Sequence, residues 1–108
     1  MDDQFQKLLD KLSEILEIII NIINYDNNID NINDENKNKL KYIFRKYEEI
    51  FYLILNGDIE NVYNLTFYMK QWRTLNINNY LFSIDEGKKL IQEISHFQLL
   101  FMMYMREI

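Results

Sequence analysis

The chain has 108 residues, and its 12 Lys and Arg against 17 Asp and Glu give a net charge of −5. It contains no Cys and only two Gly, which excludes disulfides, thiolate zinc sites, cysteine nucleophiles and the glycine-rich phosphate loops of P-loop and Rossmann enzymes. The length suits one domain, so we expect a single domain over residues 1–108. Ile and Asn are abundant and Ala is missing, which is typical of an AT-rich genome and gives Asn-based motifs less weight.

The first residues are acidic, whereas a signal peptide needs a basic segment followed by an apolar run. The longest apolar stretches, residues 15–23 and 97–105, are interrupted by polar residues and fall far short of the ~20 residues that span a bilayer. We therefore expect a soluble cytoplasmic protein without a membrane span.

Apolar residues at alternating spacings of three and four predict the first helix, over about residues 4–24. The stripe consists of Phe5, Leu8, Leu12, Ile15, Ile19 and Ile22. This spacing places all six side chains on one face of an amphipathic helix. Asn and Asp dominate residues 24–34, and because their side chains compete for backbone hydrogen bonds, we expect a loop there.

The second and third helices are predicted over about residues 35–56 and 59–75. The stripe of the second helix is Leu40, Ile43, Tyr47, Ile50 and Ile54, and that of the third is Val62, Leu65, Met69 and Trp72. Gly57 between them suits the left-handed position that ends a helix, and Asp58 suits an N-cap. So short a turn predicts antiparallel neighbours.

The fourth helix is predicted over about residues 84–107. Its start matches the Ser-x-x-Glu capping box at Ser83 and Glu86. Its stripe is Leu90, Ile94, Phe97, Phe101, Tyr104 and Ile108. With no strand pattern, the sequence predicts an all-α fold, a single-domain antiparallel bundle of four helices.

Catalytic and metal-binding patterns are incomplete. With one His and no Cys, a catalytic triad has few candidates. Glu93 and His96 have the Glu-x-x-His spacing of di-iron bundles, but a second His is missing and both residues lie off the apolar stripe, so we expect a solvated helix edge. Residues 26–37 resemble an EF-hand loop in oxygen spacing only, because Lys37 stands where the bidentate Glu is required. We expect no catalytic residue, cofactor or metal and no enzyme activity, and we leave open whether this loop binds a cation.

Charge is unevenly distributed along the chain. Acidic residues dominate residues 1–36, whereas Lys37, Lys39, Lys41, Arg45 and Lys46 form a basic segment without an acid. This segment is interpreted as a solvated helix start or as a patch paired with the acidic first helix. Binding of an anion is left open, but an acidic chain repels nucleic acid, so we do not expect a nucleic-acid partner.

The sequence features that point to a function are those typical of protein–protein interfaces. Aromatic, Arg and Met residues of the kind that dominate interfaces gather in two places, and the candidate partner-binding residues are Tyr68, Trp72, Arg73, Tyr80, Phe82, Leu99, Leu100, Met102 and Met103. The leading hypothesis is a non-enzymatic interaction protein, such as a small acidic inhibitor or immunity-type protein that blocks a basic surface. The alternative is a homodimer or larger structural subunit assembled through the fourth helix.

Overall fold

The structure is a computed structural model. It describes the backbone of residues 3–29, 34–69 and 77–107, and the side chains in these ranges except those at 25–29, 34, 65–69, 78 and 107. The elements are α1 (Asp3–Ile29), α2 (Asp34–Leu55), α3 (Ile59–Met69), α4 (Asn78–Phe82) and α5 (Asp85–Glu107). Every element of the described residues is helical, which confirms the predicted all-α class.

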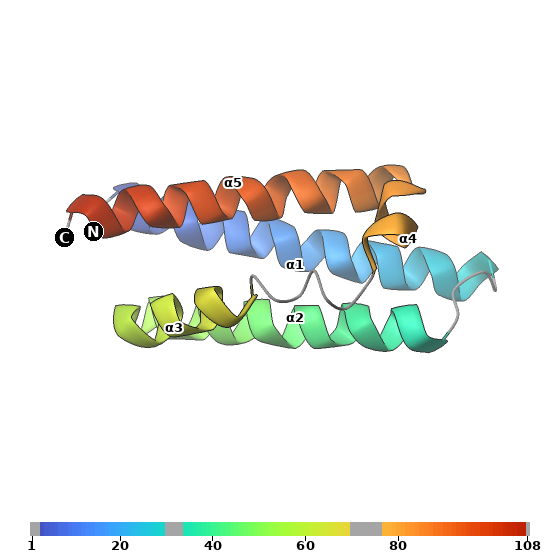
Figure 1. The fold of residues 1–108 in the computed structure, drawn as a ribbon, viewed down its shortest axis with the longest axis horizontal. Helices are drawn as coiled ribbons and strands as arrows, with labels where there is room; N and C mark the ends of the chain where they lie inside the picture. The colour runs from blue at the N-terminus through green and yellow to red at the C-terminus, as the bar shows by residue number, and fades with distance from the viewer. Residues whose placement is uncertain (1–2, 30–33, 70–76, 108) are drawn as a thin grey trace.

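Helix α1 lies between the other two long helices and packs against both α2 and α5 (Figure 1). Both neighbours run antiparallel to α1, α3 folds back along α2, and the two ends of the chain lie at the same end of the bundle (Figure 1). The molecule measures 45 × 23 × 20 Å. In the described part of the chain, no helix combines the length and the apolar character needed to cross a membrane.

The predicted stripes form the core. Apart from Phe5 at the start of α1 and Tyr104 near the end of α5, which are partly buried, all stripe residues whose side chains are described are buried. The ring of Tyr47 on α2 meets that of Phe97 on α5 edge-on at 6.2 Å, and Phe97 stacks on Phe101 at 6.2 Å. Each fully buried Leu, Ile or Phe contributes about 1.5–3 kcal/mol through the hydrophobic effect, so these stripes carry the fold.

Helix α1 extends five residues beyond the predicted end at residue 24, and most of the loop predicted over residues 24–34 is helical. Asn and Asp lower helix propensity by only about 0.7 kcal/mol or less per residue. Once a long helix has formed, each added residue gains a backbone hydrogen bond without a new nucleation step. Helix propensity alone therefore predicts the end of α1 too early.

The predicted turn between α2 and α3 is confirmed. Gly57 has a φ of +74°, its N–H donates to the carbonyl of Ile54 at 3.0 Å, and the N–H of Asp58 donates to the carbonyl of Leu53 at 2.9 Å. These two bonds form a Schellman motif, which satisfies the last carbonyls of α2. The carboxylate of Asp58 accepts from the side-chain amide of Asn61 at 2.7 Å and, more weakly, from its backbone N–H at 3.5 Å.

The short helix α4 was not predicted, and the predicted capping box of α5 is wrong. Ser83 ends α4 instead, because its hydroxyl donates to the carbonyl of Tyr80 at 2.5 Å, and α5 begins at Asp85. Ile77 and Leu81 of this segment are fully buried and anchor it to the core. Residues 70–75, predicted to continue the third helix, lie outside the described residues, whereas α3 is helical over residues 59–69.

Gly87 allows α4 to approach the first turn of α5. A Cβ added at Gly87 would lie 2.1 Å from the backbone carbonyl oxygen of Leu81, far inside van der Waals contact. Because the obstructing atom belongs to the backbone, a side chain at position 87 would force the two helices apart. Gly57, by contrast, has no atom within 4 Å of an added Cβ, and only its backbone conformation favours glycine.

We predict that Gly87→Ala lowers the free energy of unfolding by about 2–3 kcal/mol, the range expected for overpacking. Gly57→Ala serves as the matched control and should cost about 1 kcal/mol, because it strains a left-handed residue without creating a clash. Urea unfolding followed by circular dichroism measures both changes. A loss at position 87 no greater than that at position 57 would contradict the close approach of α4 to α5.

Burial raises the pKa of Tyr47 well above its ordinary value of 10.0, because an ionised phenolate would lose its hydration. Burial of the neutral Tyr47 side chain therefore stabilises the fold fully below pH 10, and this contribution is lost as the pH rises further. We predict that the free energy of unfolding falls more steeply above that pH in the wild-type protein than in Tyr47→Phe. Alkaline urea titrations of both proteins test this, and parallel pH profiles would contradict burial of the phenol.

Candidate interaction surface

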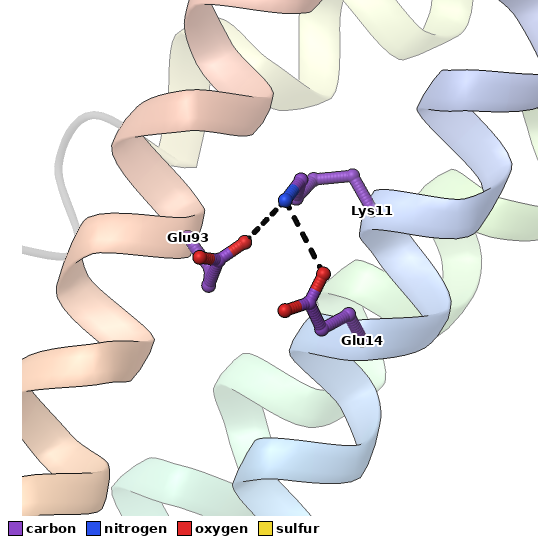
Figure 2. Close-up of polar contacts among 3 residues, drawn as sticks. All are labelled: Lys11, Glu14 and Glu93. Atoms are coloured by element: carbon purple, nitrogen blue, oxygen red, sulfur yellow. Dashed lines mark hydrogen bonds and ion pairs between the residues drawn. The ribbon is translucent and has the colours of Figure 1, made fainter.

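A cross-helix ion pair joins α1 to α5. The ammonium of Lys11 on α1 lies 2.5 Å from a carboxylate oxygen of Glu93 on α5 and 3.2 Å from one of Glu14 (Figure 2). The side chains of Lys11 and Glu93 are 16% and 18% exposed, whereas that of Glu14 is 42% exposed. The expectation that Glu93 lies on a solvated edge is therefore wrong, because Lys11 reaches it across the helix interface.

The hydrogen bond that Lys11 donates to Glu93 raises the pKa of Lys11 above its ordinary value of 10.5, although partial burial acts in the opposite direction. The amine therefore stays protonated at neutral pH, where it acts neither as a general base nor as a nucleophile.

His96 lies on the exposed side of α5. Within the described residues, no group of three or more His, Cys, Asp or Glu side chains is placed to hold a metal ion. The contact of Lys11 with Glu93 in Figure 2 joins α1 to α5.

The segment with calcium-like spacing is largely helical. Residues 26–29 continue α1 and residues 34–37 begin α2, whereas residues 30–33 lie outside the described part. An EF-hand needs its first ligands in a loop that wraps around the ion. Asp26 and Asn28 instead follow the helical backbone of α1, so the resemblance fails at the start of the pattern as well as at Lys37.

The basic segment of residues 37–46 lies on α2 and forms ion pairs within that helix. Lys39 lies 3.1 Å from Glu35, and Lys46 lies 3.7 Å from Glu49. The ammonium of Lys46 also lies 5.6 Å from the centre of the Tyr42 ring, a cation–π contact. Lys41 and Arg45 are exposed on α2.

The structure exposes three of the four candidate residues on α5. Leu99, Met102 and Met103 are 57%, 54% and 47% exposed, and we refer to these three residues as the α5 patch. Their spacing of i, i+3 and i+4 places them together on one face of the helix. Leu100 is partly buried and packs against the core, so it supports the fold as well as bordering the patch.

The other candidate residues are only partly placed. Phe82 on α4 is exposed, whereas Tyr80 is partly buried against the core with its hydroxyl covered. That hydroxyl has no hydrogen-bond partner among the described residues. The side chains of Tyr68, Trp72 and Arg73 lie outside the described residues.

Several exposed apolar residues were not predicted from the sequence. Tyr52 and Leu55 on α2 and Ile20 on α1 are about half exposed. All three lie off the core stripes, and this position in the sequence pattern could have predicted their exposure.

An open pocket of about 590 Å³ lies between α1 and the start of α5. Its lining is partly polar and partly apolar and consists of Asn21, Ile22, Ser83, Ile84, Asp85 and Glu86.

We predict that Glu93→Gln lowers the free energy of unfolding by about 1–2 kcal/mol, between the values typical of exposed and of buried ion pairs. Glu14→Gln is the matched control, because Glu14 contacts the same ammonium but is more exposed, and it should cost about 0.5 kcal/mol or less. Urea unfolding at neutral pH measures both. An equal loss of the free energy of unfolding in both variants would show that the contact of Lys11 with Glu93 is no stronger than its contact with Glu14.

Comparison of the chain with protein-family models, with curated protein sequences and with solved structures finds no match. No relative therefore supplies a function for the α5 patch or for the ion pair of Figure 2.

Proposed function

We propose that this protein is a non-enzymatic interaction module that acts by covering a surface of another protein. The observation that carries the proposal is the α5 patch. Its three large apolar side chains remain about half exposed although Leu90, Ile94, Phe97 and Phe101 already fill the core-facing stripe of the same helix. Burial of such a patch by a partner releases water from apolar surface, which is the main driving force for association.

The types of residue in the patch support binding. Met side chains are unbranched and polarisable, so they adapt to the shape of a partner surface. Lys11 pairs with the carboxylates of both Glu14 and Glu93 in the contacts of Figure 2. Their arrangement supports a structural role more than one in substrate chemistry.

A second surface favours an inhibitor of a basic target. Asp3, Asp10 and Glu17 are exposed on α1 at intervals of seven residues, which places them along one line of the helix surface. We call these three residues the α1 ridge. A line of carboxylates on a protein of net charge −5 attracts a basic surface and accelerates the encounter with it.

Self-association through α5 is the alternative to a foreign partner. An isologous pair of α5 helices would bury Leu99, Met102 and Met103 of both copies at once. This arrangement would make the protein a homodimeric structural or accessory subunit. Molecular mass in solution separates it from an interaction with another protein.

We predict that the double substitution Leu99→Glu and Met103→Glu lowers binding to the partner at least about ten-fold, because it places charges in the apolar contact. The test compares proteins captured from the source cell by the wild-type chain and by this variant, with the mass of the purified chain measured by light scattering. Tyr52→Glu is the matched control, since Tyr52 is equally exposed but lies on α2.

A partner retained by the wild type and the control but lost by the double variant supports the proposal. A dimer dissociated by the same two substitutions supports the homo-oligomeric alternative. A monomer whose captured proteins are the same with and without the two substitutions overturns the role of the α5 patch. Circular dichroism of each variant checks that the bundle remains folded.

A further inference from the structure

Three of the five methionines of the chain lie within one turn of α5. Met102, Met103 and Met105 occur near the end of this helix, which lies at the edge of the bundle (Figure 1). Met102 and Met103 are 54% and 47% exposed, whereas Met105 is partly buried and packs against the core. The same short segment therefore presents two thioether side chains to solvent and partly covers a third.

Helix geometry accounts for this difference in exposure. Met105 lies four residues after Phe101, a buried member of the core stripe, and so shares its side of the helix. Met102 and Met103 lie three and four residues after Leu99, which is exposed. Met105 therefore serves as an internal reference for the reactivity of its two neighbours.

The exposed thioethers are the most oxidisable groups of the α5 patch. A thioether sulfur reacts with hydroperoxides to give a sulfoxide, and this reaction requires the peroxide to reach the sulfur. The chain contains no Cys, so no thiol of its own competes for the oxidant. Leu99, the third residue of the patch, has only an aliphatic side chain and is inert under the same conditions.

We propose that Met102 and Met103 form a redox-sensitive modification site, at which hydroperoxides oxidise the exposed thioethers to sulfoxides and so weaken binding through the α5 patch. The site of oxidation follows from exposure and from the chemistry of sulfur, whereas its effect on a partner rests on the proposed function. Because both residues belong to the patch, their oxidation changes most of its apolar surface.

The reaction needs only the side chain and the peroxide. The sulfur lone pair attacks one oxygen of the peroxide, and an S–O bond forms as the O–O bond breaks. With hydrogen peroxide, the proton of the transferred oxygen passes to the departing hydroxide, which leaves as water. The sulfur is oxidised and the peroxide is reduced, so the reaction requires no further electron donor or acceptor.

The product differs from methionine chiefly in polarity. A sulfoxide oxygen accepts hydrogen bonds from water, and burial against an apolar partner would remove that water without replacing it. In the free chain, the exposed positions of Met102 and Met103 keep the sulfoxides hydrated, so we expect the bundle to stay folded. Sulfoxide reductases restore the thioether, which makes such a modification reversible.

The first experiment treats the folded full-length chain with hydrogen peroxide and quantifies the sulfoxide at each methionine by tandem mass spectrometry. We expect Met102 and Met103 to be oxidised about five-fold faster than Met105, because access to the sulfur limits the reaction. In concentrated urea the three rates should become equal. Circular dichroism measures the helix content before and after oxidation and should show no change.

The second experiment measures the apolar surface by retention on a hydrophobic column. Oxidised wild-type protein should elute earlier than the untreated protein. The double substitution Met102→Leu and Met103→Leu removes both thioethers but keeps their apolar character, so its retention should resist peroxide. Met105→Leu is the matched control and should respond as the wild type does. Capture of a partner from the source cell is then compared for the same oxidised and untreated proteins.

Oxidation of Met105 in the folded chain as fast as that of Met102 and Met103 overturns the inference. Loss of helix on oxidation, or an equal decrease of retention in the wild type and the double leucine variant, also overturns it. The proposed function fails separately. If Leu99→Glu with Met103→Glu abolishes capture of a partner but oxidation does not lower it, only the redox-sensitive site is wrong. If oxidation lowers retention as expected but neither oxidation nor these substitutions alter capture, the proposed function fails and the modification site stands without its effect on binding.

Discussion

The bundle depends on burial of α1 from two sides. An amphipathic helix that packs against one neighbour needs a single stripe, but α1 packs against both α2 and α5 and buries Leu9 and Ile18 beside its main stripe. Only polar residues remain along most of its outward surface, which is why the α1 ridge can be acidic without disturbing the core. The arrangement also leaves α5 at the edge of the bundle (Figure 1), where Leu99, Met102 and Met103 are exposed.

The polar and apolar contacts between α1 and α5 have different roles. Burial of large aliphatic and aromatic side chains supplies most of the free energy that holds the helices together. The bond from Lys11 to Glu93 joins two fixed points in a partly dehydrated interface, where a displacement would leave a charge unpaired. It also holds the carboxylate of Glu93 against α1.

Much of the architecture could be predicted from residue spacing. Apolar residues once per turn located the helices, and Gly57 with Asp58 located the turn between α2 and α3, because both signals are local properties of the chain. The end of α1 could not be located in this way, because weak helix formers still extend a helix that has already nucleated. Helix α4 escaped prediction because its two buried residues, Ile77 and Leu81, are too few to form a periodic pattern.

The sequence by itself determined that this protein buries its large apolar residues in a helical core and that α5 has more of them than one core face accommodates. Both follow from periodicity, which depends only on the geometry of one helix. The tertiary structure decided which of these residues stay exposed, since Leu100 packs inward and Leu99 does not. It also decided that Lys11 meets Glu93 and that Gly87 lies against Leu81. Such pairings depend on how separate helices are placed, and residues 82 positions apart carry no local signal of their contact.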